Sequence, residues 1–424
     1  MGLLSTLSLG IFVALVAFLS GPISHIIRIG GVFLTPNPTV LGEGQGPVYI
    51  EDTIHCEDVH HYRPANLLFT ACEDYKNPRF SWFPPLGNLV PSTTSGSIHL
   101  VDPKTMKSTR LAFTNFKGPF ITHGIDVIKD QQHEDAVYIF AVNHLPNPAY
   151  FNATSDSEIP EGTHKARSQV ELFHHILGSK TVQHIRSINH PLIETPNDIY
   201  AESPESFYVT NDHFYREGAM RHIEDVWPSA KWSSIIHVQL PTNTKDTEIQ
   251  ASVALTGLWN NNGLAHGRTT NEMIISSAVG GELYIATPNP DISISNHSLS
   301  ISESVTFNIV TDNPSYYVDP YATSDDDVSG VVIAGISRGI RLPVTAKDPD
   351  GIDPVQVWYA RPSGSGVGAG WEKRLLFEDD GTRIRTASAA VLVPVEMNGD
   401  GVKRAWLFVT GFMSERMVAV QVEL

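Results

Sequence analysis

Polar residue pairs recur along the chain, and each leads into a short apolar segment that is typical of a β-strand. Their first residues stand at 57, 123, 197, 262 and 312, at spacings of 66, 74, 65 and 50 residues. The pairs are Glu57-Asp58, His123-Gly124, Asn197-Asp198, Asn262-Gly263 and Asp312-Asn313. A sixth polar segment near Thr386 precedes the strand-like run at 405–410. Short strands repeated at roughly regular spacing are typical of a β-propeller with about four strands per blade. The sequence therefore predicts an all-β fold, a six-bladed β-propeller with these pairs around its axis.

Length, composition and charge agree with one large β domain. The chain has 424 residues, of which 41% are hydrophobic, which is enough for a packed core. Its formal net charge of −17 argues against nucleic acid as a partner, because that would call for clustered Lys and Arg. We expect residues 31–424 to form a single propeller domain.

Residues 1–30 are predicted to be a signal peptide or signal anchor with a short linker. The apolar run from Leu3 to Leu19 ends in small and turn-forming residues, although no Lys or Arg precedes it. The run predicts export through the secretory pathway, either as a secreted glycoprotein or as one anchored to the membrane and facing the exterior. Whether the segment is cleaved stays open. Sequons at Asn152 and Asn296 fit the same compartment.

The only two cysteines, Cys56 and Cys72, bracket the first strand pair. Two cysteines in an exported chain favour one disulfide bond. If the hairpin turns at Pro64, residues i and 128−i face each other, and Cys56 then stands opposite Cys72 at a distance that suits a disulfide. The alternative is two buried free thiols.

Two segments are expected to lie outside the repeated strands. The polar stretch from Pro146 to Arg167 predicts an exposed insertion. Between Phe214 and Trp227 the apolar residues approximate helical spacing, which predicts a helix over one face of the propeller. An apolar stripe on that helix could gate the substrate or contact lipid, together with the N-terminal segment. It could equally pack against the blades.

The polar pairs supply the oxygen ligands that a hard cation needs. Calcium takes several carboxylate and amide oxygens. Five side chains give two charges and three neutral amides around one ion, with a position left for substrate: Glu57, Asn197, Asn262, Asp312 and Asn313. Asp58, Asp198 and the backbone carbonyl of Ile125 would hold a second calcium ion deeper in the channel. The alternative for any one of these residues is a turn or a strand cap.

Two histidines bracket one predicted hairpin, so both can reach the same mouth of the channel. We expect His123 and His144 to act as a dyad in which one ring positions the other as a proton acceptor. The segment Gly335-Ile336-Ser337-Arg338-Gly339 matches the nucleophile elbow of serine hydrolases. That motif requires a helix directly after the strand. Pro343 opposes one, so we interpret the segment as a strand-ending turn.

The ordered set of polar segments resembles the serum paraoxonase/arylesterase family from about residue 45 to the C-terminus. The matching segments are Cys56-Glu57-Asp58, His123-Gly124-Ile125, Val142-Asn143-His144, Pro196-Asn197-Asp198-Ile199, Thr210-Asn211-Asp212-His213, Asn262-Gly263 and Asp312-Asn313. The resemblance implies a six-bladed propeller with one catalytic and one structural calcium ion, held by the two ligand sets above, and a His123–His144 dyad. It implies hydrolysis of small-molecule lactones, aryl esters and, promiscuously, phosphotriesters.

The chain departs from the family at its ends. Animal members join the N-terminal region to the C-terminus by a disulfide, whereas this chain has no cysteine near its end. Closure is therefore expected to rest on pairing of residues 47–50 with 417–420. Two rival functions stay open: a non-catalytic, calcium-stabilised binding module, and a sugar-lactonase of the wider propeller superfamily.

Overall fold

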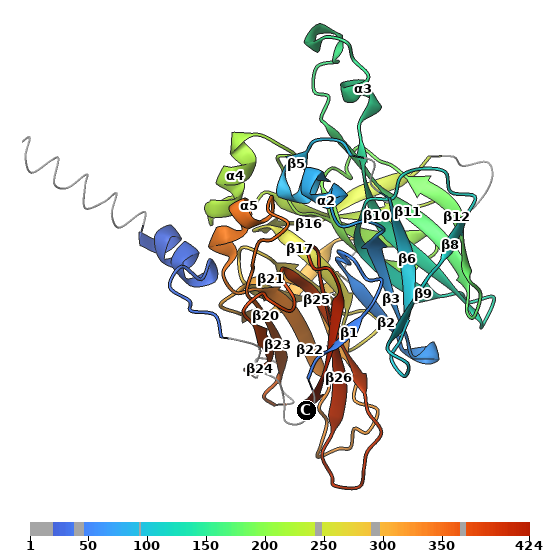
Figure 1. Cartoon of the computed structure of the whole chain (residues 1–424), viewed down its shortest axis with the longest axis vertical. Coiled ribbons are helices and arrows are strands. Elements are labelled where there is room, and N and C mark those ends of the chain that lie inside the picture. Colours follow the sequence, from blue (N-terminus) through green and yellow to red (C-terminus); the bar gives the residue numbers. More distant parts are fainter. Residues whose placement is uncertain (1–19, 38–45, 93–94, 242–247, 290–296, 365–369) are drawn as a thin grey trace, which may run out of the picture.

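The computed structural model describes residues 20–37, 46–92, 95–241, 248–289, 297–364 and 370–424 (Figure 1). The predicted signal run at 3–19 and the sequon residue Asn296 lie outside these ranges. The described chain forms an all-β, propeller-like fold with a few short helices. Among the described helices, none has the length and apolar character needed to cross a bilayer.

Most strands belong to antiparallel meanders of four, in chain order. The first three meanders are β2(Val59–Tyr62), β3(Leu67–Glu73), β6(Gly96–Asp102) and β7(Lys107–Arg110); β9(Thr122–Lys129), β10(Ala136–Pro146), β11(Ala166–Ile176) and β12(Thr181–Ile188); and β13(Pro196–Ser203), β14(Ser206–Asn211), β15(Ser233–Gln239) and β16(Gln250–Leu258). The next two are β17(Asn261–His266), β18(Met273–Ser277), β19(Glu282–Pro288) and β20(Leu299–Thr306); and β21(Val310–Tyr317), β22(Gly330–Ile336), β23(Val355–Pro362) and β24(Trp371–Asp379). The last contains β25(Ala387–Pro394), β26(Arg404–Gly411), β27(Met417–Glu423) and β1(Val48–Ile50). Short β8(Ala112–Thr114) adds to β12 in parallel, and β4(Trp82–Phe83) pairs with β5(Asn88–Leu89).

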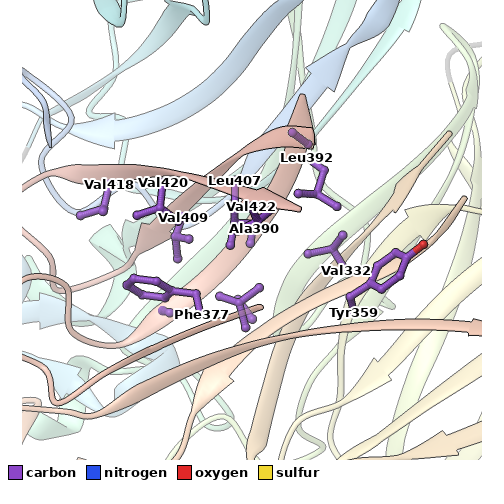
Figure 2. Close-up of a cluster of buried hydrophobic side chains, with 14 of the residues drawn as sticks. Val332, Tyr359, Phe377, Ala390, Leu392, Leu407, Val409, Val418, Val420 and Val422 are labelled. Carbon is purple, nitrogen blue, oxygen red and sulfur yellow. The ribbon is translucent and has the colours of Figure 1, made fainter. Parts of the chain in front are cut away.

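The predicted set of six separate four-stranded sheets differs from the sheets observed. The last two meanders join into one eight-stranded sheet, because β21 and β25 meet in a single parallel bridge, Asn313 to Ala389. The two halves of that sheet nevertheless pack face to face. Figure 2 shows Val332 and Tyr359 of the β21–β24 half against Leu392 and Leu407 of the other half, in one buried cluster. The sheet is therefore folded at the bridge into two layers.

The first strands of the meanders form a closed ring. β2 contacts β9, and contacts then follow from β9 to β13, β17, β21 and β25, which returns to β2. The N-terminal strand β1 completes the last meander by pairing with β27, with Val48 opposite Ala419 and Ile50 opposite Met417. The predicted pairing of residues 47–50 with 417–420 is confirmed. Main-chain hydrogen bonds thus join the two ends of the ring.

The predicted disulfide between Cys56 and Cys72 is present. The register assumed for it was wrong by one residue, because Val59 pairs with Thr70 and Tyr62 with Leu67, so that paired numbers sum to 129. The hairpin turns through a 3-10 segment, Arg63–Ala65, which takes up the extra residue. Cys56 lies ahead of β2, so the disulfide ties the incoming segment to β3 rather than joining opposed strand residues.

The helices are short and gather mainly at one end of the ring (Figure 1). They are residues 20–29, α2(Pro78–Ser81), α3(Pro148–Phe151), α4(Ala219–Val226) and α5(Leu342–Thr345), with further 3-10 turns at Pro84–Leu86, Asp156–Glu158 and Gly339–Arg341. The insertion between β10 and β11 carries α3 and projects from the body, as predicted. The predicted helix at 214–227 is shorter, because Gly218 at its N-cap has a φ of +88° and interrupts the helical backbone.

Candidate active site

Five of the ring strands carry the same irregularity at the predicted polar segments. In each of β9, β13, β17 and β21, two residues oppose one residue of the neighbouring strand, at 123–124, 197–198, 262–263 and 312–313, and β25 has one extra residue at Ser388. Each is a one-residue β-bulge, which re-aims side chains that would otherwise alternate between the two faces of a strand. The bulges are the physical reason why two successive residues can both serve the axis.

Two glycines let neighbouring ring strands approach closely at the bulges. A Cβ on Gly124 would lie 2.5 Å from the backbone oxygen of Asn197 and 2.5 Å from a carboxylate oxygen of Asp198. A Cβ on Gly263 would lie 2.5 Å from the Cα of Asn313. Glycine therefore follows the first polar residue of these two pairs because any larger residue would push the strands apart.

The predicted catalytic calcium ligands come together at one cavity of about 300 Å³. Glu57, Asn197, Asn262 and Asp312 line it, and the Asn313 amide donates to Glu57 Oε1 at 2.8 Å. Four buried oxygens of this set have no hydrogen-bond partner within the described chain: Glu57 Oε2, Asn197 Oδ1, Asn262 Oδ1 and Asn313 Oδ1. Buried polar atoms are normally satisfied, so four unpartnered acceptors on residues that line this cavity or bond to its lining fit a bound cation.

The carboxylates of this set repel one another. Burial, followed by the charges of Asp312 and Asp58, raises the pKa of Glu57 well above its usual range. Burial, followed by the charge of Asp58, raises the pKa of Asp312 in the same way. These buried negative charges favour a cation between them.

The predicted structural ligands Asp58 and Asp198 also lie in the ring, with both carboxylates already bonded to backbone N–H groups. Asp58 accepts from Val59 and Ile125, and Asp198 accepts from Ile199 and Leu264, at 2.7 to 3.0 Å. Ile125 thus enters this arrangement through its N–H. Burial raises the pKa of Asp58 to about 6. In each case one bond comes from the next residue and the other from the neighbouring ring strand.

Asp126 makes the same pair of bonds, and the sequence analysis missed it. It accepts from the backbone N–H of Val127 and of Ala201, and its oxygens also meet His60 Nδ1 at 3.0 Å and His266 Nε2 at 2.8 Å. Its place directly after Ile125 was the available signal. The three carboxylates Asp58, Asp126 and Asp198 each join adjacent ring strands.

The two predicted dyad histidines are in contact. His144 Nε2 lies 2.9 Å from His123 Nδ1, and His144 Nδ1 lies 2.8 Å from Ser168 Oγ. His123 lines the cavity, with its Nε2 3.8 Å from Glu57 Oε1, and His144 lies behind it. Burial lowers the pKa of His123 to about 3 and that of His144 well below its usual range. Both rings are therefore neutral at pH 7, and one can pass a proton to the other.

A buried arginine that the sequence analysis did not single out supports this dyad. Arg79 is fully buried and donates to Glu73 Oε1 at 3.0 Å, to the carbonyl and hydroxyl of Thr122, and to the carbonyl of Phe412. Its guanidinium lies 4.2 Å from the ring of Phe83, which stands edge-on to His123 at 5.3 Å. Arg79 thus holds both the residue before His123 and the aromatic ring beside it.

The outer walls of the cavity come from helices rather than from the ring. His25, Ile26 and Ile29 of the N-terminal helix line it, and that helix is held by a 2.8 Å contact between His25 Nε2 and the carbonyl of Val279. Residues of α4 and α5 complete the walls. Because residues 1–30 were assigned to a signal or anchor, this contribution was not predicted.

The helix α4 buries charged residues and exposes apolar ones. Arg221 and Glu224 are buried, whereas Met220, Ile223 and Val226 are exposed. Arg221 donates to the carbonyl of Pro85 at 2.6 Å, and Glu224 accepts from two backbone N–H groups of the preceding loop. These bonds satisfy the buried charges and leave an apolar stripe facing outward.

The nucleophile-elbow alternative has little support in the geometry. Ser337 is buried, and the chain after it runs into the 3-10 turn Gly339–Arg341 before the four-residue helix α5. The motif needs an exposed serine between a strand and a helix. The interpretation as a strand-ending turn agrees with the structure.

Comparisons with known proteins point to one family. A family model described as arylesterase matches residues 80–320, more than half of the chain. Serum paraoxonase/arylesterase 2 of Gallus gallus is 30% identical over 159 residues, which are 37% of this chain and 38% of that protein. Serum paraoxonase/arylesterase 1 of Homo sapiens is 27% identical over 201 residues, 47% of this chain and 46% of that protein. The chain thus matches less than half the length of these relatives.

Among solved structures, a protein of unknown function from Dyadobacter fermentans is similar with a TM-score of 0.47 and 10% identity, over 92% of this chain and 99% of that one. That likeness has no bearing on the chemistry. The family model covers His123, His144, Asn197, Asn262 and Asp312, whereas Glu57 precedes its range. On these matches the chain belongs to the paraoxonase/arylesterase family.

Proposed function

We propose that this protein is a calcium-dependent hydrolase of carboxylic esters, aryl esters and lactones. The observation that carries the proposal is the group of four unpartnered buried oxygens beside the His123–His144 pair in one cavity. Paraoxonase and arylesterase relatives support the substrate class. We propose further that the two halves of the eight-stranded sheet are separate blades, so that residues 31–424 form one domain of six blades.

Glu57, Asn197, Asn262, Asp312 and Asn313 would hold the catalytic ion, and Asp58, Asp198 and Ile125 a structural one. Bound at the first set, calcium supplies a Lewis acid for the carbonyl oxygen of the substrate. The Asn313 amide bonds to Oε1 of Glu57, and Oε2, which has no hydrogen-bond partner among the described residues, would be the oxygen available to a cation. Calcium takes about six to eight oxygen ligands, so these five residues, with one oxygen each, would leave at least one position for substrate or water.

His123 accepts the proton of the attacking water at Nε2, the ring nitrogen that faces the cavity. Its other nitrogen is engaged by His144, and Ser168 fixes the opposite side of the His144 ring. A proton taken by His123 can thus be shared along the pair. Phe83 and the N-terminal helix restrict the access of bulk water to this edge of the cavity.

A substrate panel with and without a chelator tests the proposal. Aryl esters and lactones of several ring sizes are expected to be hydrolysed, and exhaustive chelation is expected to remove the activity until calcium is returned. Hydrolysis that survives complete removal of metal would exclude the calcium role. Calcium binding without turnover of any ester would favour the non-catalytic binding module, and turnover of sugar lactones alone would favour the sugar-lactonase.

We also propose that the protein is exported and contacts lipid through the helices around the cavity. The disulfide, the exposed sequon at Asn152 and the outward apolar residues of α4 support this proposal. Wild-type protein is expected to sediment with phospholipid vesicles, and a Met220→Glu, Ile223→Glu variant is expected to stay in solution. Equal sedimentation of the two would contradict the lipid contact.

A further inference from the structure

Three side chains of types that commonly bind metals lie close together at the end of β9 that is remote from the candidate active site. Asp130 directly follows β9, His133 lies in the turn to β10, and His174 lies in β11. One potential ligand atom from each lies within 4.8 Å of the others. His123 and Asp130 are seven residues apart along a strand, a separation of roughly 23 Å. The cluster is therefore separate from the cavity that holds Glu57.

The carboxylate of Asp130 is oriented before any ion binds. Its Oδ1 accepts the backbone N–H groups of Gln132 at 2.8 Å and His133 at 3.3 Å. Its Oδ2 is thereby directed at His133 Nδ1, 3.0 Å away, and His174 Nε2, 2.9 Å away. Such fixing of a ligand by surrounding hydrogen bonds is typical of metal sites.

The three side chains of the cluster differ in their exposure to solvent. The side chain of Asp130 is 3% exposed, that of His174 18% and that of His133 64%. Although burial raises the pKa of Asp130, hydrogen bonds from Gln132 and the two imidazoles outweigh it and lower the pKa to about 2. The carboxylate is thus ionised at neutral pH, and the site is open to solvent on the His133 side.

We propose that Asp130, His133 and His174 bind one divalent transition-metal ion of the Zn²⁺ class. Two imidazoles and one carboxylate form a ligand set that zinc accepts, with its remaining position filled by water. Calcium requires six or more oxygens, which this cluster does not offer. The bound ion joins the β9–β10 turn to β11.

The ring planes of the two histidines allow a shared ion. The lone pair of an imidazole nitrogen lies in the plane of the ring, so an ion bound by two rings must lie near both planes. The rings of His133 and His174 are inclined at 73°, so their planes intersect. A second trio, Glu202, His237 and His297, fails this condition because its two rings stack 3.6 Å apart at 13°.

The second trio is also committed to other contacts. His237 Nε2 lies 2.9 Å from Ser206 Oγ, and the hydroxyl of Ser206 donates to Glu202 at 2.7 Å. An ion could bind to this second trio only if these hydrogen bonds were broken. The trio serves instead as a control, because it also consists of one carboxylate and two histidines.

Zinc binding to the calcium-loaded protein tests the proposal. Isothermal titration at pH 7.5 with ZnCl₂, in excess calcium, is expected to give one zinc ion per chain. His133→Gln and His174→Gln are expected to weaken it at least tenfold, while His297→Gln leaves it unchanged. His133 is an exposed turn residue, so its variant is expected to keep the wild-type melting temperature without zinc.

Cobalt substitution gives a second readout that does not depend on activity. Co²⁺ in a mixed nitrogen and oxygen site is expected to show visible absorption bands that His133→Gln removes and His297→Gln retains. Absence of stoichiometric zinc, or loss of binding in His297→Gln rather than in His133→Gln, would overturn the proposal.

Discussion

Replacing His123 by Gln is expected to lower kcat for aryl esters and lactones by about 10²- to 10⁴-fold, the usual contribution of a positioned general base. His123 presents Nε2 to the cavity beside Glu57, and His144 and Ser168 hold the rest of the pair. Gln nearly preserves the volume of the ring but cannot accept and release a proton at neutral pH. Steady-state kinetics in saturating calcium measure the effect.

His184→Gln provides a matched control for His123→Gln. His184 lies in β12 of the same meander, contacts Glu171 at 3.0 Å, and does not line the cavity. Its variant should retain wild-type kcat. His144→Gln should give a smaller loss than His123→Gln, because His144 acts only through His123. Near-wild-type turnover by a calcium-bound His123→Gln protein would remove the base assignment.

Replacing Arg79 by Met is expected to lower the free energy of unfolding by about 3–5 kcal/mol, because it removes the cation that is paired with the buried Glu73 carboxylate. Both side chains of the pair are fully buried. The same change frees the carbonyls of Thr122 and Phe412 and removes the cation beside Phe83, so kcat should fall as well. Urea unfolding monitored by tryptophan fluorescence gives the stability difference.

Two further variants distinguish the effect of breaking a buried ion pair on stability from the effect of removing any arginine. Arg361→Met removes a comparable but exposed pair with Glu372, and should cost less than about 1 kcal/mol. The double variant Glu73→Gln, Arg79→Met should recover part of the loss, because the buried carboxylate is then neutralised together with the arginine. An Arg79→Met protein as stable as Arg361→Met would contradict this role.

Local patterns allowed much of the fold to be predicted. Strand pairing of 47–50 with 417–420 was predicted because no cysteine near the C-terminus is available to join the two ends by a disulfide. The convergence of Glu57, Asn197, Asn262 and Asp312 followed from their phase with the strand repeat. The bulges that aim these residues inward could not be derived, because a bulge is set by the pairing of two strands.

Features that depend on contacts with residues distant in the sequence were not predicted, or were predicted incompletely. The buried face of α4 contains Arg221 and Glu224, which are satisfied by backbone groups of other segments and, for Arg221, also by Asp212. Helical periodicity therefore left open whether the apolar residues face outward or pack against the blades, and the structure shows that they face outward. Arg79 gives no sequence signal, since its four acceptor atoms belong to Glu73, Thr122 and Phe412, which lie in three separate segments. The one-residue error in the Cys56 hairpin arose from a 3-10 turn where a simple turn at Pro64 was assumed.

Calcium stoichiometry tests the central claim, that residues far apart in sequence jointly hold an ion at the axis. Chelated protein is dialysed to equilibrium against radioactive calcium, and bound ions are counted per chain for wild type and for Glu57→Gln. Two ions for wild type and one for Glu57→Gln are predicted, because Gln keeps the shape of the side chain but removes one of the two charges of the first site. A wild-type protein that binds no calcium, or a Glu57→Gln protein that binds as many ions as wild type, would contradict the account.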